Sequence, residues 1–218
     1  MRINQFVAQA TGLSRRATDK AIAEERVRVN DAFATLGQNV SKSDSISLDG
    51  NQLVLPTSNT TILIDKPTGY VCSRDGQGAP TIYDLVPSEY ASLKHVGRLD
   101  KDSSGLVILT DDGTLAHELS HPSFNKSKQY FVRLDRPLES KDQKAIEEGQ
   151  INLDNKPSRF AFKNIQKDTM DVVLNEGRNR QIRRTFTKLN YNVIELRREK
   201  LGPYSLSQLK GKQYIKLI

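Results

Sequence analysis

The chain has 218 residues, with 33 Lys and Arg against 26 Asp and Glu, and its formal net charge is +7. A chain of this length forms one large domain or a medium domain with a small one, and its single cysteine, Cys72, excludes an intramolecular disulfide and any multi-cysteine metal centre. Because no apolar run approaches the ~20 residues that span a bilayer and the first residues lack the apolar core of a signal peptide, we expect a cytoplasmic protein with no membrane contact.

Residues 1–56 predict a small module of two helices and a few short strands. An apolar stripe from Ile3 to Ala10 has the spacing of an amphipathic helix that ends at Gly12. Ser14 can cap a second helix over residues 15–25. Short alternating segments then predict strands at residues 27–29, 46–48 and 53–55.

The polar, turn-rich residues 57–61 predict a linker, which leaves residues 62–218 as the second domain. Apolar alternation and short apolar runs predict strands at residues 62–64, 105–110, 130–134, 170–174, 193–196 and 214–217. Helical spacing predicts helices at residues 114–120 and 179–189. Because strands outnumber helices and do not alternate regularly with them, we predict an α+β fold with a largely antiparallel mixed sheet and flanking helices.

Positive charge is concentrated in one segment of the second domain. Residues 178–200 hold eight basic side chains against two acidic ones, and this excess equals the net charge of +6 carried by residues 57–218. Six of the eight are arginines, whose planar guanidinium suits bidentate phosphate contacts. A solvated charged face would also be basic, but the excess of arginine favours a phosphate-binding patch.

The densest candidate for chemistry is the run of residues 97–110, in which Asp100 lies in a polar loop before an apolar strand. A rigid scaffold on both sides of such a loop can hold a reactive carboxylate. An aspartate near a glycine-rich turn more often forms the turn than reacts. Asp100 alone therefore does not identify a site.

A second candidate lies at residues 176–184. With Ile182 facing the core, Arg180 and Arg184 fall on the opposite side of the predicted helix, towards solvent or phosphate. Arg183 lies about 100° around the helix from Ile182, at the border of the core. From there it can hold a carboxylate in its ionised form, or it can extend over the edge of the core.

Lys128 and Tyr130 begin an alternating strand and share one of its faces, where most tyrosines serve packing. His117 and His121 are four residues apart, a spacing that can bind a metal ion, but the sequence offers no third ligand. We therefore predict no metal site.

Five segments occur in the order and spacing of one known family. They are Lys-Pro-Thr-Gly at 66–69, Gly-Arg-Leu-Asp at 97–100 with Ser-Gly-Leu at 104–106, Lys-Gln-Tyr at 128–130, residues 176–184, and Leu-Gly-Pro at 201–203. Over nearly all of residues 60–204 the chain resembles the ribosomal-RNA pseudouridine synthases of the RsuA/RluB/RluF type. Residues 2–50 resemble the small RNA-binding module of ribosomal protein S-four, although Asp31 stands where a glycine usually closes a turn.

The resemblance implies a reaction and a set of site residues. Members of this family isomerise a chosen uridine to pseudouridine, which implies that Asp100 is the catalytic aspartate and acts on a uridine flipped out of folded RNA. It also implies that Tyr130 stacks on the base, that Leu201 packs behind Tyr130, and that Arg98 fills the vacated space. Arg183 would pair with Asp100 and keep its carboxylate ionised.

The resemblance further implies ribosomal RNA, or an intermediate of ribosomal-subunit assembly, as the partner of a monomeric enzyme. The reaction needs no cofactor, and we predict none. Lys128 is a predicted substrate contact. Phosphate contacts are expected from Arg180, Arg184, Arg197, Arg198 and, in the amino-terminal module, Arg15 and Arg16.

Other functions fit parts of the sequence. A non-catalytic RNA-binding or ribosome-assembly factor would need only the small module and the basic segment. Glycoside hydrolysis would need a second carboxylate beside Asp100, and Asp102 is the only near neighbour in sequence. Within the leading interpretation, residues 178–184 and residues 101–103 favour the large-subunit 23S RNA over the small-subunit 16S RNA.

Overall fold

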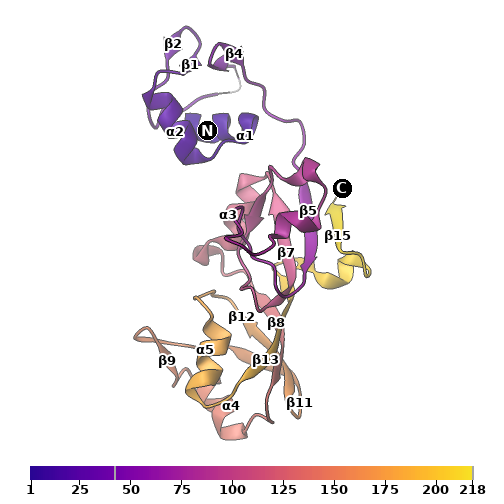
Figure 1. Cartoon of the computed structure of the whole chain (residues 1–218). Helices are drawn as coiled ribbons and strands as arrows, with labels where there is room; N and C mark the ends of the chain where they lie inside the picture. Colours follow the sequence, from indigo (N-terminus) through magenta and orange to yellow (C-terminus); the bar gives the residue numbers. More distant parts are fainter. Residues whose placement is uncertain (42, 218) are drawn as a thin grey trace. The chain divides into compact units, whose positions relative to one another are not determined.

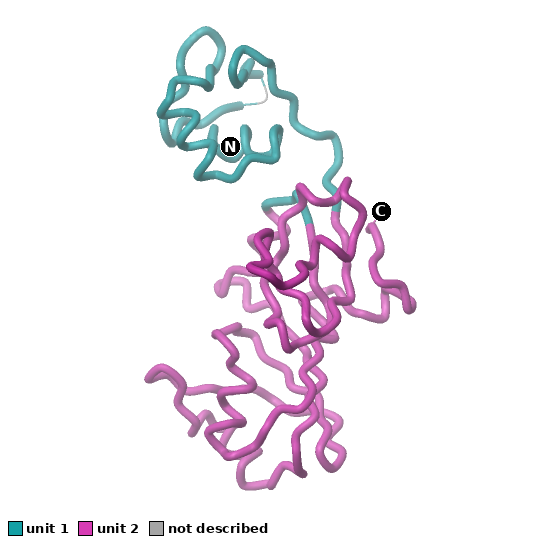
Figure 2. Tube along the Cα trace, viewed as in Figure 1, with its two compact units in different colours: residues 1–60, 110–113 teal, residues 61–109, 114–218 magenta. Residues whose placement is uncertain are grey.

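The computed structural model describes residues 1–41 and 43–217, and the chain divides into two compact units (Figure 2). Unit 1 comprises residues 1–60 and 110–113, and unit 2 comprises residues 61–109 with the chain from Thr114 onward. Within the described residues, no helix is long and apolar enough to cross a membrane.

Unit 1 packs two helices against a small sheet. The helices α1 (Ile3–Thr11) and α2 (Arg15–Ala23) confirm the two predicted ones, and Ser14 caps α2 by accepting a hydrogen bond of 3.1 Å from the Ala17 N–H. The sheet has the order β2-β1-β3-β4 and consists of β1 (Val27–Val29), β2 (Ala32–Phe33), β3 (Ile46–Leu48) and β4 (Asn51–Gln52). The strand predicted at residues 53–55 is wrong, because the sheet ends at Gln52 and the two leucines beyond it pack against the core outside any strand.

Unit 2 is built on one nine-stranded mixed sheet, whose main path runs β11-β12-β8-β13-β7-β5-β15, with β14 beside β13 and β6 beside β7. The strands are β5 (Thr61–Lys66), β6 (Lys94–Val96), β7 (Ser104–Thr110), β8 (Lys128–Leu134), β11 (Ala161–Gln166), β12 (Thr169–Leu174), β13 (Val193–Leu201), β14 (Tyr204–Ser205) and β15 (Tyr214–Leu217). β13 is parallel to β7 and antiparallel to β8, and the pairs β8–β12, β11–β12 and β5–β15 are antiparallel. The predicted α+β fold with a largely antiparallel sheet is confirmed.

The helices α3 (Gly113–Ser120), α4 (Ser140–Glu147) and α5 (Gln181–Lys188) accompany the sheet (Figure 1). A short hairpin joins β9 (Asn152–Leu153) to β10 (Lys156–Pro157). Single 3₁₀ turns lie at η1 (Ile82–Leu85), η2 (Ser88–Tyr90), η3 (Pro122–Phe124) and η4 (Leu206–Leu209). The sequence predicted α3 and α5 but missed α4 and β11, because α4 buries only Ile146 and β11 is largely exposed, so neither has an apolar period.

Tyr130 lies where two hydrophobic clusters of unit 2 meet, and it packs against both. The helix-side cluster includes Val132, Leu196, Ile182 and Phe186. The loop-side cluster includes Ile62, Ile64, Leu99, Val107 and Leu109. A third cluster, called the back cluster below, contains the strand residues that alternate with these, including Leu63, Leu106, Ile108 and Leu201. Because strand side chains alternate between faces, the back cluster lies on the face opposite Tyr130.

Gly105 allows the central strands β7 and β13 to approach each other closely. It lies opposite Arg198 in the parallel pairing, and a Cβ atom at Gly105 would lie 2.6 Å from the Arg198 backbone nitrogen. Its φ of +106° is a backbone conformation that residues with side chains rarely adopt. A side chain at this position would therefore force the two strands apart.

We expect Gly105→Ala to lower the free energy of unfolding by about 1–3 kcal/mol or more, because it adds backbone strain to a steric clash. Urea denaturation followed by circular dichroism measures the change. Gly113→Ala is the control, since a Cβ atom there meets nothing within 4 Å, and its stability should stay within about 0.5 kcal/mol of the parent or rise slightly. Equal stability of the two variants would contradict the close strand approach.

Candidate active site

The loop that carries Asp100 is anchored on both sides. It connects β6 to β7, and within it the Ser103 N–H donates to the Asp100 carbonyl oxygen at 3.1 Å. From outside the loop, the Gly69 N–H donates to the Lys101 carbonyl oxygen at 2.7 Å, while Leu99 packs in the loop-side cluster. The Asp100 side chain is 35% exposed. The loop thus presents a carboxylate to solvent from a fixed backbone.

Lys66 closes the neighbouring turn as a fully buried cation. Its ammonium donates at 2.9 Å to the carbonyl oxygens of Pro67 and Tyr70. Burial lowers the pKa of Lys66, while the carboxylates of Asp102 and Asp100 act in the opposite direction. The ammonium therefore lies within electrostatic reach of both carboxylates.

Arg180 provides the guanidinium next to Asp100. Its Nη1 lies 3.4 Å from Asp100 Oδ2, and its two terminal nitrogens donate to the two Asp102 oxygens at 2.9 and 2.8 Å. The hydrogen bonds from Arg180 hold the pKa of the Asp102 carboxyl below its usual value. Arg180 is the N-cap of α5 and has a left-handed φ of +47°, which takes its side chain out of the helical pattern.

Arg183 forms its ion pair with Asp102 and not, as predicted, with Asp100, although the Asp100 carboxylate also acts on it electrostatically. Its Nε lies 3.3 Å from Asp102 Oδ2, and its Nη2 donates to the Asp102 carbonyl oxygen at 2.8 Å. Its Nη1 donates at 2.8 Å to the carbonyl oxygen of Val193, where β13 begins. From the border of α5 the side chain reaches across to β13, so it ties the loop to the sheet, and Arg180 takes the place beside Asp100.

The predicted phosphate contact of Arg198 is also wrong. Arg198 is 2% exposed and its Nε donates to the Leu106 carbonyl oxygen at 2.8 Å. The sequence predicted that the strand ends at residue 196, whereas β13 continues to Leu201. Arg198 therefore lies on the same face as Leu196, inside the sheet core, and is directly paired with Tyr130 of β8.

The remaining predicted residues have varied surroundings. Arg98 is exposed, and Lys128 is half-buried at the start of β8. Leu201, at the end of β13, packs in the back cluster rather than behind Tyr130. In unit 1, Arg15 and Arg16 are exposed at the start of α2.

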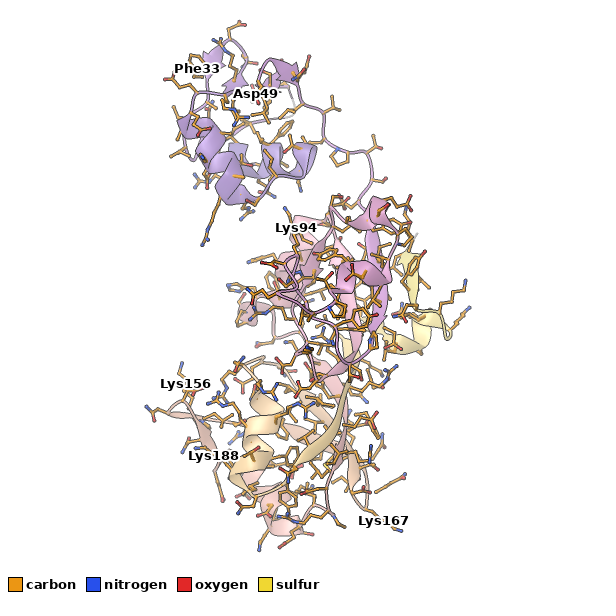
Figure 3. All side chains as sticks on the ribbon, in the orientation of Figure 1. Phe33, Asp49, Lys94, Lys156, Lys167 and Lys188 are labelled. Atoms are coloured by element: carbon orange, nitrogen blue, oxygen red, sulfur yellow. The ribbon has the colours of Figure 1, made fainter. Side chains whose placement is uncertain are left out.

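Two other arginines of the basic segment are paired with carboxylates. Arg184 donates to both oxygens of Asp154 at 2.9 and 2.5 Å, and Arg197 donates to Asp65 at 2.6 Å. Exposed lysines of unit 2, by contrast, extend from the ribbon at Lys94, Lys156, Lys167 and Lys188 (Figure 3). Much of the positive charge that the sequence assigned to phosphate thus serves internal pairing.

The structure also reveals roles for Asp102 and Lys66 that sequence reasoning missed. The sequence marked Asp102 only as the carboxylate nearest to Asp100, yet Asp102 accepts hydrogen bonds from Arg180, 78 positions away in sequence. No local spacing reports such a contact. His117 and His121 lie with ring centroids 4.8 Å apart, and among residues 1–41 and 43–217 no group of three potential metal-binding side chains occurs.

The Asp100 carboxylate thus lies 3.4 Å from a guanidinium in an anchored loop, among several cations. Such an arrangement suits an enzyme that acts on a polyanion. The RNA pseudouridylate synthase family model matches residues 60–188, more than half of the chain, and this range contains Asp100, Tyr130 and Arg183. A crystal structure of a pseudouridylate synthase, 32% identical in sequence, matches with a TM-score of 0.71 over 100% of this chain and 96% of that one. The chain belongs to the RNA pseudouridylate synthase family, whose members are isomerases.

Named relatives cover nearly the whole chain. It is 37% identical over 210 residues to the ribosomal small subunit pseudouridine synthase A of Pasteurella multocida, which covers 94% of this chain and 90% of that protein. It is 34% identical over 219 residues to the ribosomal large subunit pseudouridine synthase B of Xanthomonas campestris, which covers 94% of this chain and 44% of that protein.

We expect Asp102→Asn to lower the isomerisation rate by about 100-fold, since the variant loses the ion pairs that orient Arg180 beside Asp100 and small displacements at a reacting group have effects of this size. RNA affinity should stay unchanged. Single-turnover kinetics and filter binding measure the two quantities.

Asp154→Asn is the matched control for this variant. It removes the equivalent two-oxygen contact to Arg184, on the same helix but away from Asp100. Its rate should stay within about twofold of the parent, as for a surface ion pair. The same loss of rate in both variants would indicate damage to α5 and not loss of the Arg180 anchor.

Proposed function

We propose that this chain converts a uridine of ribosomal RNA to pseudouridine, with Asp100 as the catalytic carboxylate. The observation that carries the proposal is the Asp100 carboxylate, partly exposed from an anchored loop and 3.4 Å from the Arg180 guanidinium. The guanidinium places an opposite charge beside the carboxylate that the chemistry uses. Relatives that carry the names of both ribosomal subunits support ribosomal RNA as the substrate.

The reaction breaks the bond between N1 of uracil and C1′ of ribose, and then joins C5 of the base to C1′. The Asp100 carboxylate either attacks the ribose or abstracts a proton from it and stabilises developing positive charge. Tyr130 is half-buried and packs on the two clusters, so its position is fixed before a base arrives. Stacking on an aromatic ring is worth about 1–3 kcal/mol, which helps to hold a detached base.

The target uridine must leave its RNA helix before it can reach Asp100, at a cost of a few kcal/mol. Arg98 is exposed two residues before Asp100, and we assign it to the space that the base vacates. Arg184, which is partly exposed, supplies a phosphate contact. The exposed lysines Lys94, Lys156, Lys167 and Lys188 of unit 2 supply others. Arg15 and Arg16 of the amino-terminal module, residues 1–56, supply further contacts to RNA.

Asp102 argues against glycoside hydrolysis. That reaction needs a second carboxyl group that is protonated and acts as an acid, and such groups have raised pKa values. The hydrogen bonds from Arg180 instead lower the pKa of Asp102. We therefore assign Asp102 no proton-transfer step.

The ribosomal subunit is a separate part of the proposal. The sequence favours 23S RNA. The match covers 90% of the small-subunit relative and 44% of the large-subunit relative. A test of the substrate must therefore include 16S RNA as well as 23S RNA. We further propose that a monomer acts in the cytoplasm, on ribosomal RNA or on a subunit-assembly intermediate, without a cofactor.

The test uses 16S and 23S RNA that carry tritium at C5 of uridine. Because C5 loses its hydrogen when it bonds to C1′, the wild-type protein should release tritium from one of the two RNAs. Asp100→Asn should reduce release by at least about 1,000-fold, a loss typical of an essential catalytic group, while its affinity for the same RNA stays near that of wild type. Tritium release by Asp100→Asn at the wild-type rate, or no release from either RNA by the wild-type protein, would refute the proposal.

A further inference from the structure

Three side chains form a continuous group on one face of the sheet: Lys128, Tyr130 and Arg198. Lys128 and Tyr130 are two residues apart in β8 and therefore share a face. Arg198 of β13 lies directly opposite Tyr130 in the antiparallel pairing. The next residues on that face, Val132 and Leu196, both belong to the helix-side cluster, which confirms the shared orientation. A base stacked on Tyr130 would lie beside two cations, Lys128 along β8 and Arg198 across on β13.

Arg198 is buried without full hydrogen bonding. Its Nε donates to Leu106, but within the described part of the chain its Nη2 is buried and has no hydrogen-bond partner. Its Nη1 lies 3.9 Å from the position that a Cβ atom of Gly97 would occupy, so the guanidinium sits beside the start of the Asp100 loop. A buried polar group that lacks a partner is unfavourable in free energy. A ligand atom that accepts from the Arg198 Nη2 would remove this unfavourable contribution.

Lys128 is held only weakly. Its ammonium lies 3.5 Å from the Lys126 carbonyl oxygen, the limit of a hydrogen bond. Its neighbour Glu176 is already engaged, because Glu176 Oε1 accepts from Arg178 at 3.0 Å and also from Gln181. Burial and the charge of Arg198 both lower the pKa of Lys128, while Glu176 raises it. An added negative charge would relieve the repulsion between the two cations.

We propose that Lys128 and Arg198 form a binding site for the negatively charged uracil that exists between breaking of the N1–C1′ bond and formation of the C5–C1′ bond. This inference rests on the proposed function. When the first bond breaks, its electron pair stays on the base, and the charge spreads over N1 and the two carbonyl oxygens. When C5 bonds to C1′, the C5 hydrogen leaves as a proton and N1 takes up a proton, so the charge disappears.

A phosphate group fits this position less well than the base does. Arg198 is almost completely buried, and the half-buried Tyr130 lies opposite it in the pairing of β8 with β13. A stacked base places its carbonyl oxygens at the edge of that ring, towards the flanking strands. Preorganised cations in a site with little water stabilise a charge that develops during reaction far more than they do in solution.

The experiment measures single-turnover rates of Lys128→Gln on RNA with either uridine or 5-fluorouridine at the target position. Fluorine makes the base more acidic, so its anion needs less stabilisation. We expect the variant to be about 100-fold slower than wild type with uridine, and the deficit to shrink below about tenfold with 5-fluorouridine. For the fluorinated RNA, the rate is the loss of intact 5-fluorouridine after nuclease digestion. Lys128→Arg keeps the charge and should restore most of the rate.

Controls separate the anion site from folding and from phosphate binding. Lys216→Gln removes an exposed lysine of β15 in the same sheet and should react at the wild-type rate. Arg198→Lys, checked for its wild-type circular dichroism and melting temperature, should show the same dependence on the leaving base as Lys128→Gln. The affinity of Lys128→Gln for RNA and the salt dependence of that affinity should match the wild type, because no phosphate contact is lost.

Three results would overturn the inference while leaving the proposed function intact: an unchanged rate for Lys128→Gln, an equal deficit with both RNAs, or a smaller salt dependence of binding. The last result would indicate a phosphate contact. An inactive wild-type protein would instead overturn the proposed function, and this inference with it.

Discussion

Asp102 ties the loop of Asp100 to α5 and β13 through two arginines, and the geometry of the site depends on this connection. Its side chain accepts from both terminal nitrogens of Arg180, and its backbone carbonyl accepts from Arg183. The hydrogen bonds to Asp102 therefore fix the plane of the Arg180 guanidinium, and its Nη1 lies 3.4 Å from Asp100 Oδ2. Because a two-oxygen contact fixes direction as well as distance, Asp100 gains an oriented cation although the pair is partly open to solvent.

Positive charge exceeds negative charge around this loop. Lys66, Arg180 and Arg183 interact electrostatically with Asp100 and Asp102, and Arg198 repels both Lys66 and Lys128. Such an excess is unfavourable for the folded protein alone, since each buried cation loses hydration. It becomes favourable when a polyanion binds, and a site that is electropositive before binding also attracts RNA over distance. The fold thus places excess positive charge where a bound polyanion would neutralise it.

Apolar patterning predicted the sheet well but could not predict the partners of the charges. β8 and β12 alternate along their length, and Asp100 precedes a run of buried residues, so the strands and the reactive loop were evident. Helical geometry assigned Arg180 to the solvent face, but Arg180 is the N-cap and has a left-handed backbone, so that geometry does not apply to it. The burial of Arg198 depends on a strand that runs five residues beyond its apolar pattern. Neither fact is encoded by local periodicity.

The place of Arg198 in the middle of the sheet has a consequence for how its charge acts. A surface arginine loses rotamer entropy when it meets a substrate, whereas the Arg198 side chain is already fixed by Leu106 and by the close approach of β7 at Gly105. Solvent ions screen a surface charge strongly and a buried one weakly. The absence of a side chain at Gly105 therefore does more than bring two strands together. It lets a guanidinium lie inside the sheet opposite Tyr130, held in one orientation by its hydrogen bond to the Leu106 carbonyl oxygen.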